Sequence, residues 1–234
     1  MSSLAGAVSN HILLKLPEQE IQILQPHLRP VTLERYRVLC DWGTPNDLVF
    51  VNRGMICLIS SSEKGEMIEA GVVGAEGAYG GEILLHGNHI SYRAVVQLSV
   101  DGLTIAWSTL DHLLPRLPSL QERILRYLHL LMTQFAQSVV CSRFHPASAR
   151  LARWLLTSYD RSGGENVRLT QEMLSRMLGV PRTWVNHVAG ELQERGLISY
   201  RSGVITIRSV EELERYACEC YRVTREELQS YLEA

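Results

Sequence analysis

The polar residues with the clearest capacity for specific hydrogen bonding lie close together at 182–187, in the run RTWVNH. Arg182, Thr183, Asn186 and His187 all carry hydrogen-bonding groups, and arginine and asparagine can each make paired hydrogen bonds to a base edge in DNA. If the segment is a helix, its apolar residues share one face and these polar residues the other. The apolar face would consist of Val185, Val188, Ala189 and Leu192.

A second helical pattern precedes this run. Thr170 is a suitable N-cap, Gln171 suits the first turn, and Met173, Leu174, Met177 and Leu178 form an apolar face. Gly179 tolerates a positive φ in the turn, and Pro181 can open the next helix because a first-turn N–H has no helical partner. The pair predicts a helix-turn-helix whose second helix enters the major groove, the alternative being an ordinary helical hairpin.

Residues 196–207, GLISYRSGVITI, indicate a β-hairpin that turns at 201–203. A hairpin directly after a helix-turn-helix is the wing of a winged helix. Over both helices and the wing, the candidate DNA-binding residues are Thr170, Gln171, Arg182, Thr183, Trp184, Asn186, His187 and Arg201.

The distribution of charge favours the same partner. The net charge is −2, yet residues 143–208 contain ten arginines, no lysine and five acidic residues, a local balance of +5. Residues 1–142 and 209–234 are acidic, at −3 and −4. The planar guanidinium donates two parallel hydrogen bonds to phosphates and guanine edges, so this segment is suited to double-stranded DNA.

The elements before this segment are of two kinds. From about residue 31 to 107, short β-type runs broken by Gly, Asn and Pro predict an antiparallel, jelly-roll-like β-roll. A helix is then expected over 120–142, opened by a capping box at Ser119 and Glu122. Its coiled-coil-like spacing predicts a homodimer seam at Ile124, Leu128, Leu131 and Phe135, the alternative being a helix buried in one chain's core.

We therefore expect an α+β chain: a β-roll domain with N-terminal helices at 1–118, a dimerisation helix at 119–143 and a winged helix-turn-helix domain at 144–234. No apolar stretch reaches membrane-spanning length, and the N-terminal segment lacks a basic stretch followed by an apolar core. The expected location is the cytoplasm, with no membrane partner.

Other chemistries find less support. The five cysteines are scattered and odd in number without a CxxC, which predicts neither a disulfide framework nor a zinc site, and Cys218 and Cys220 would lie on different faces of a helix. Glu82, His86 and His89 could ligate a metal, but their spacing imposes no geometry, so solvated loop histidines are expected. A cupin-type enzyme would carry His-x-His, which the chain lacks. We expect no metal ligands and no catalytic residues.

Three stretches together resemble the CRP/FNR family of bacterial transcription regulators: Gly81-Glu82 with Arg93, RLARWLL at 150–156, and 169–198. The resemblance implies a cyclic-nucleotide-binding-like roll, a dimerisation helix and a winged helix-turn-helix. It also implies a sequence-specific regulator that binds a palindromic operator as a homodimer, with RNA polymerase as a further partner. Thr183 stands where the family commonly has Glu, and His187 where it has a second Arg, so a different base is expected there.

In members that bind cyclic nucleotides, a Gly-Glu pair and a later Arg-Ser or Arg-Thr pair hold the cyclic phosphate and ribose. Ala94 replaces that hydroxyl residue here, and Phe135 stands where the dimer helix usually offers Thr-Ser. The candidate effector-binding residues are thus Gly80, Gly81, Glu82, Arg93, Ala94 and Phe135. A cyclic nucleotide is one cofactor alternative; the others are another anion, or Glu82 and Arg93 pairing with each other in a roll that binds nothing. A metal- or ligand-binding enzyme and an effector-independent DNA-binding protein are the alternative functions.

Overall fold

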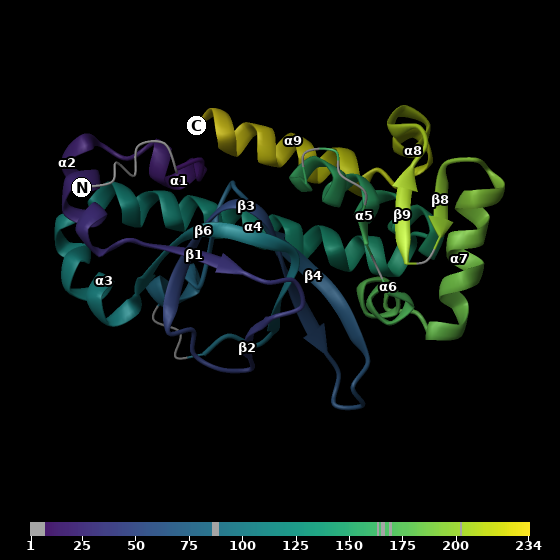
Figure 1. The fold of residues 1–234 in the computed structure, drawn as a ribbon, viewed down its shortest axis with the longest axis horizontal. Helices are drawn as coiled ribbons and strands as arrows, with labels where there is room; N and C mark the ends of the chain where they lie inside the picture. Colours follow the sequence, from purple (N-terminus) through teal and green to yellow (C-terminus); the bar gives the residue numbers. More distant parts are fainter. Residues whose placement is uncertain (1–7, 86–88, 163, 165–166, 169, 202) are drawn as a thin grey trace. The chain divides into compact units, whose positions relative to one another are not determined.

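The computed structural model describes residues 8–85, 89–162, 164, 167–168, 170–201 and 203–234, and the ribbon in Figure 1 follows them by label and colour. They form two compact units. The first comprises residues 8–58, Val72–Met132 and Leu228–Ala234, and the second comprises Ile59–Gly71 and Thr133–Glu227. The predicted α+β class, with a β-roll, a long helix and a winged helix-turn-helix, is confirmed, whereas the predicted division into three domains stays a prediction.

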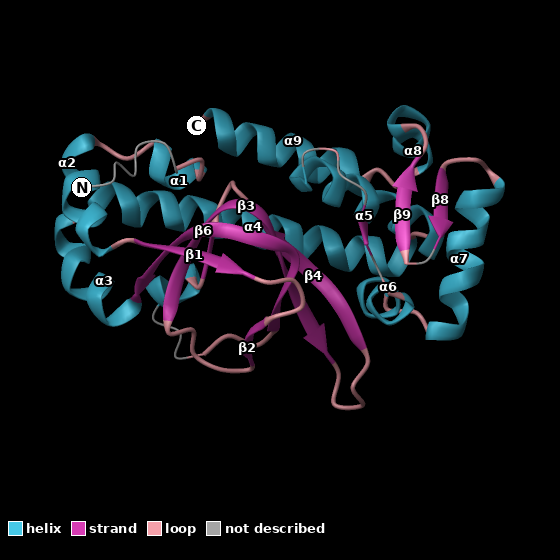
Figure 2. Ribbon diagram, in the orientation of Figure 1, coloured by secondary structure: helices cyan, strands magenta, loops and turns pink. Residues whose placement is uncertain are grey.

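The first unit is built around a six-stranded sheet in the order β1-β6-β3-β4, with β2 also pairing with β6 and β5 with β3 (Figure 2). Two glycines let β3 and β6 approach closely. A Cβ on Gly54 would lie 2.2 Å from the Ser99 carbonyl oxygen, and one on Gly102 would lie 2.3 Å from that of Phe50. The strands are β1 (Arg29–Leu33), β2 (Val38–Asp41), β3 (Asp47–Ser61), β4 (Met67–Val73), β5 (Ala78–Tyr79) and β6 (Arg93–Ala106).

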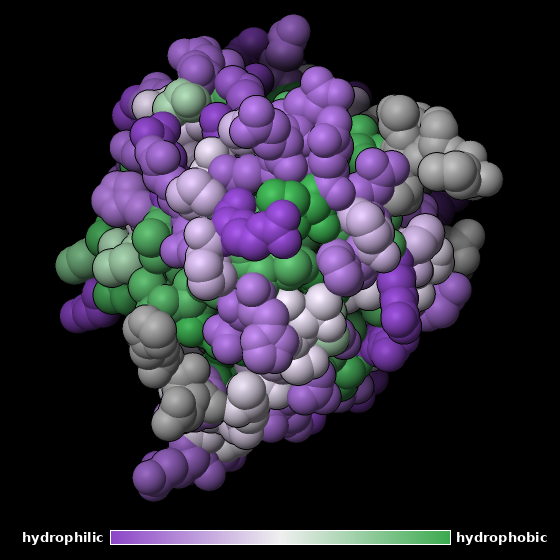
Figure 3. Space-filling model, turned by 90° about the vertical axis from the view of Figure 1, so that its left-hand side faces the viewer, coloured by the Kyte–Doolittle hydropathy of each residue, from purple (hydrophilic) through white to green (hydrophobic). Residues whose placement is uncertain are grey.

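Short helices precede, interrupt and follow the strands of the first unit. Asn10 is fully buried and caps the first of them, because its Oδ1 accepts from the Leu13 N–H at 3.3 Å while its Nδ2 donates to the Val51 and Gly77 carbonyls at 2.8 Å. Hydrophilic side chains cover most of the face drawn in Figure 3 and surround a smaller hydrophobic patch. The helices are α1 (His11–Leu14), α2 (Glu18–Leu24), η2 (Gln25–His27), η3 (Gly81–Leu85), α3 (Trp107–Leu113) and η4 (Leu114–Arg116).

The longest helix, α4 (Pro118–Phe144), begins on a buried carboxylate. Glu20 of α2 accepts from the Ser119 N–H at 2.9 Å and from the Leu120 N–H at 3.0 Å, which satisfies two of the first-turn donors. The predicted capping box is therefore wrong. Glu122 instead pairs with Arg126 at 2.6 Å on the exposed side of the helix.

The predicted dimer seam on α4 is also wrong in its residues. Ile124, Leu128 and Leu131 are buried within the chain's own core, so they have no face left for a partner. A different set of α4 residues is exposed at alternating spacings of four and three. These residues are Leu125, His129, Met132, Ala136, Val139 and Arg143.

The second unit combines a helical core with a three-stranded sheet in the order β7-β9-β8. The short strand β7, which pairs Val167 with Ile205 and Arg168 with Val204, has no counterpart in the sequence-based expectation. The elements are α5 (Ala147–Ser162), β7 (Val167–Arg168), α6 (Gln171–Leu178), α7 (Arg182–Glu194), β8 (Ile198–Arg201), β9 (Val204–Ile207), α8 (Val210–Tyr216) and α9 (Cys220–Glu233).

The outer part of the β3–β4 hairpin, Ile59–Gly71, belongs to this second unit. Glu69 is buried there and accepts a hydrogen bond from the Trp154 indole Nε1 of α5 at 2.8 Å. Nearby, a Cβ on Gly179 would lie 3.3 Å from Ile68 Cδ1, so the hairpin also contacts the turn between α6 and α7. The hairpin thus supports the side of the helix-turn-helix.

We expect Trp154→Phe to lower the free energy of unfolding by about 1–3 kcal/mol, because it leaves a buried carboxylate without one of its donors. Urea unfolding followed by circular dichroism measures the change. Trp184→Phe is the matched control, since Trp184 is 57% exposed and loses little packing. Equal unfolding midpoints for the two variants would show that the bond to Glu69 contributes nothing to stability.

Candidate nucleic-acid interface

The turn between α6 and α7 is held by short-range hydrogen bonds. Thr170 caps α6 as expected, its hydroxyl accepting from the Met173 N–H at 3.3 Å. Gly179 adopts the left-handed conformation, with φ 60° and ψ 37°, and ends the helix. Ser175 donates its hydroxyl to the Val180 carbonyl at 2.6 Å, so this small residue closes the turn as well as leaving room for the crossing helix.

Helix α7 divides into the two predicted faces. Its core face is the apolar set that the sequence indicated: Val185, Val188, Ala189 and Leu192 are all buried. Pro181 precedes the helix in an extended conformation, with φ −56° and ψ 143°. The exposed residues of the first two turns are Arg182, Thr183, Trp184, Asn186 and His187. The structure therefore gathers five of the candidate residues on one solvent-facing surface of α7.

Two contacts order the side chains on this surface. Gln171 of α6 donates from Nε2 to Asn186 Oδ1 at 2.6 Å, so the amide nitrogen of Asn186 is the group that can donate to a base. The rings of Trp184 and His187 meet edge to face, with centroids 5.7 Å apart. These contacts reduce the rotamer freedom that would otherwise be lost when the surface meets a ligand.

The far end of α7 is fixed by a tyrosine. The Tyr216 hydroxyl donates to Glu191 and lies 3.1 Å from Ser148 Oγ, and the hydrogen bond from Tyr216 lowers the pKa of the Glu191 carboxyl. Arg195 lies over the Tyr216 ring, 4.9 Å from its centroid. Gln193 Oε1 accepts from the Tyr200 N–H at 2.8 Å, which links α7 to the next strand.

The hairpin after α7 is confirmed. In its ladder Ile198 lies opposite Ile207 and Arg201 opposite Val204. Gly203 has a φ of 75°, as a tight turn requires, and Ser202 of the predicted turn lies outside the described residues. Arg201 is exposed at the end of β8, where a wing arginine can reach a phosphate.

The candidate effector residues of the roll are partly brought together. Gly80 has a φ of 91°, and Gly81 and Glu82 begin the 3₁₀ turn that follows it. Arg93 does not pair with Glu82, so the predicted pairing is wrong, whereas the absence of a ligand in the roll stays a prediction. Arg93 Nη2 instead bonds to Asp41 Oδ2 at 2.6 Å, because the two residues lie directly opposite in the β2–β6 ladder. Glu82 accepts a hydrogen bond from the Tyr92 hydroxyl.

Several polar atoms around this turn are buried. Glu82 Oε2, Arg93 Nε and Trp107 Nε1 have no hydrogen-bond partner among the described residues. Burial raises the pKa of the Glu82 carboxyl, although the bond from Tyr92 opposes the shift. A Cβ on Gly80 would lie 3.5 Å from Trp107 Nε1, which brings the indole donor next to the turn. Buried groups of this kind are available to a polar ligand.

The remaining effector candidates contribute less. Ala94 is fully buried in β6 and its methyl group offers no hydrogen bond. A Cβ on Gly81 would lie 2.9 Å from the Ile124 side chain, so α4 covers the turn closely. Phe135 is half-buried on α4 in the second unit, and its role stays a prediction. Of the weighed metal ligands, His89 is exposed and His86 lies outside the described residues.

One group of chemically active side chains was missed by the sequence-based interpretation. Cys218 lies in the connection between α8 and α9 and Cys220 is the first residue of α9, so the two thiols are not placed on different faces of one helix as predicted. With Cys141 and His145 they form a cluster whose sulfur and ring-nitrogen atoms all lie within 4.8 Å of one another. The short spacings Cys141-x3-His145 and Cys218-x-Cys220 were the available signal.

Comparison with known proteins supports the interpretation of the α6–α7 region. Residues 149–216 match the model of the Crp-like helix-turn-helix domain. The global nitrogen regulator of Nostoc sp. is 25% identical to this chain over 194 residues, which are 79% of this chain and 87% of that protein.

Two solved structures share the fold. A transcriptional regulator of the Crp/Fnr family from Eubacterium rectale superposes with a TM-score of 0.70 at 14% identity, covering 88% of this chain and 96% of that chain. The cyclic di-GMP-responsive global regulator CLP of Xanthomonas campestris superposes with a TM-score of 0.66 at 17% identity, covering 82% and 100%.

Within the described part of the chain, no helix combines the length and the apolar character needed to cross a membrane. The winged helix-turn-helix, the matched domain and the shared fold lead to one conclusion. The chain is a DNA-binding transcription regulator with a Crp-like helix-turn-helix domain at residues 149–216, and it shares its fold with regulators of the Crp/Fnr type.

Proposed function

We propose that this regulator reads a palindromic DNA operator as a homodimer, with the exposed face of α7 in the major groove. The observation that carries the proposal is the clean division of α7 between its buried apolar residues and an exposed surface that begins with Arg182. Arg182 can donate two hydrogen bonds to a guanine, and Asn186 can donate to an acceptor on a neighbouring base. Such a regulator meets DNA in the cytoplasm, and the proposed role needs no catalytic residue.

The other candidates have supporting roles in this scheme. Thr170, at the start of α6, and Arg201, on the wing, are exposed and suited to contacts with phosphates on either side of the groove. Gln171 acts through its bond to Asn186. Thr183 offers a hydroxyl and a methyl group, so it can contact a thymine where a carboxylate would select a cytosine.

We expect Arg182→Ala to weaken binding to the cognate operator by about 1–3 kcal/mol and to relax the preference at one base position. Fluorescence anisotropy with cognate, single-base-changed and scrambled duplexes measures both effects. Arg215→Ala is the control, since Arg215 is an exposed arginine of α8 outside this surface. A full preference for the cognate duplex in Arg182→Ala would contradict the assignment.

A second copy of the chain is the proposed occupant of the exposed stripe on α4. Met132 is 64% exposed and Val139 is 67% exposed, and the two are separated by one heptad, with Leu125 one heptad earlier. Large apolar side chains at heptad spacing are typical of a coiled-coil seam. A dimer also presents two copies of α7, as a palindrome with half-sites about 34 Å apart requires.

The double variant Met132→Glu/Val139→Glu should be a folded monomer with weak DNA affinity, because carboxylates at a dimer seam would be buried without partners. Sedimentation velocity gives the mass and circular dichroism the fold. Arg126→Glu is the control, because it changes the net charge by the same amount as the double variant. Arg126 lies about 100° around the helix from Leu125 and is therefore outside the exposed stripe. A double variant that remains dimeric would place the interface elsewhere.

For the roll, we propose an anionic effector other than a cyclic mononucleotide. Arg93 Nε and Trp107 Nε1 are donors that a ligand can use, but Ala94 supplies no hydroxyl, and Asp41 already neutralises Arg93. A ligand must compete with Asp41 for the guanidinium. A specific pocket that lacks part of its donor set loses much of its affinity for the ligand that needs those donors.

Calorimetry should accordingly show no micromolar binding of cyclic AMP or cyclic GMP to the wild type. Cyclic di-GMP, to which the Xanthomonas campestris regulator responds, is a further probe. The Asp41→Asn variant should bind anions more tightly than the wild type, because the substitution leaves Arg93 unneutralised, and Arg93→Ala should abolish the gain. Micromolar binding of a cyclic mononucleotide to the wild type that is lost in Arg93→Ala would restore the family's usual effector.

A further inference from the structure

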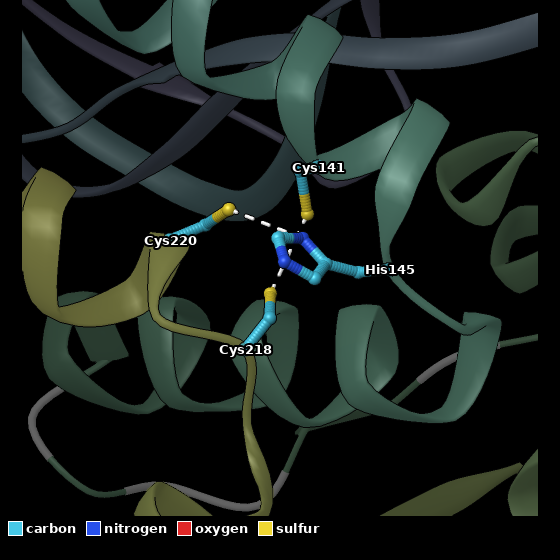
Figure 4. A group of neighbouring side chains, drawn as sticks. All are labelled: Cys141, His145, Cys218 and Cys220. Atoms are coloured by element: carbon cyan, nitrogen blue, oxygen red, sulfur yellow. Dashed lines mark hydrogen bonds between the residues drawn. The ribbon is translucent and has the colours of Figure 1, made fainter.

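We propose that Cys141, His145, Cys218 and Cys220 form a structural zinc site. Figure 4 shows the four side chains converging from three segments of the second unit. Cys141 lies in the last turns of α4, His145 in the connection to α5, and the other two cysteines at the junction of α8 and α9. A zinc ion bound here would join segments that are more than 70 residues apart in the sequence.

The distances between the ligand atoms are close to those of a coordination sphere. Cys141 Sγ and Cys218 Sγ are 3.5 Å apart, and Cys220 Sγ lies 3.4 Å from His145 Nδ1. A tetrahedral Zn²⁺ with Zn–S bonds of about 2.3 Å and a Zn–N bond of about 2.1 Å holds its ligand atoms roughly 3.5–3.8 Å apart. Small movements of the side chains therefore suffice to bind the ion.

The surroundings of the four residues complete the case. His145 has its other ring nitrogen, Nε2, 3.0 Å from Glu219 Oε1, the arrangement in which a carboxylate orients a metal-bound imidazole. Gln137 Nε2 lies 3.0 Å from Cys220 Sγ, where it can donate to a thiolate. Glu219 thus leaves His145 Nδ1 for the metal, and the Cys220 thiolate can accept from Gln137 while it binds the ion.

The ligand set favours zinc and a structural role. Three thiolates and one imidazole form a closed, four-coordinate shell, whereas a catalytic zinc keeps a position for water. The three cysteines are buried, which suits a site that is not meant to exchange ligands with solvent. The site would carry a net charge of −1, and the guanidinium of Arg153, which interacts electrostatically with Cys141, can balance it.

The position of the site indicates what it does. His145 lies between Phe144, the last residue of α4, and Ala147, the first of α5. A metal bound to this connection and to the α8–α9 junction would fix the direction in which α5 leaves α4. Since α5 packs on both α7 and α8, the metal would hold the orientation of the DNA-reading helices.

The first test is the metal content of the full-length protein purified under reducing conditions. Elemental mass spectrometry should give about one zinc per chain in the wild type. The control variant Cys40→Ser should give the same content, because Cys40 lies in β2 and not in the cluster. Cys141→Ser and Cys218→Ser should lose most of it. Glu219→Gln should retain zinc but release it to a chelator at a 10- to 100-fold lower chelator concentration, because it weakens the orientation of His145.

A second measurement uses only the wild type, so it does not depend on whether the variants fold. Removal of zinc with a strong chelator should lower the thermal midpoint by about 5 °C or more, and added zinc should restore it. Cobalt added to the metal-free protein should give the charge-transfer and visible bands of a tetrahedral thiolate site. The proposal would be overturned if the metal-free protein took up neither zinc nor cobalt. It would also be overturned if the purified protein contained a Cys141–Cys218 disulfide instead of a metal ion.

Discussion

A buried carboxylate of α2 determines where the longest helix of the molecule begins. Glu20 accepts from the first N–H groups of α4, where the positive end of the helix dipole adds to the attraction. The residues of α4 up to Met132 belong to the first unit, and those from Thr133 onward belong to the second unit. Helix α4 is therefore a covalent part of both units. Once its first turn is fixed, the direction of every later side chain around its axis follows from the helical repeat. The buried stripe, the exposed heptad stripe and Cys141 all depend on this starting point.

The exposed surface of α7 likewise depends on a small number of contacts that hold the helix in place. Helix α7 is held by its buried valines and leucine on one side, by Tyr216 near its C-terminal end and by Gln171 near its N-terminal half. Gly190, in the middle of α7, has open space where a side chain would be, although glycine costs about 1 kcal/mol in a helix interior. Packing within the described part of the chain therefore does not require a glycine at this position.

Sequence-based prediction succeeded where the interacting residues are close together in the sequence and failed where they are far apart. The helix-turn-helix was predictable because the Thr170 cap, the Gly179 turn and the face of α7 each arise within a few residues. The contacts that were missed join distant segments: Glu20 to Ser119 across 99 residues and Cys141 to Cys218 across 77. Arg93 was singled out as an effector candidate, but its partner Asp41 could not be predicted, because the pairing depends on the β2–β6 register, which no local pattern specifies. The prediction of the dimer seam on α4 was wrong because the periodicity of a helix shows which residues form an apolar stripe but not which partner covers that stripe.

Helix α9 has a consequence for the order in which the protein can be completed during synthesis. Its residues from Leu228 onward belong to the first unit, where the Tyr231 hydroxyl donates to the Glu76 carbonyl at 3.1 Å and the Tyr231 ring packs 5.3 Å from that of His11. The ribosome makes these residues only after all of the second unit. The roll can therefore acquire its full set of contacts only once this segment, which is made after the DNA-reading helices, is available. A nascent chain stalled before Leu228 would carry a complete helix-turn-helix beside an unfinished roll.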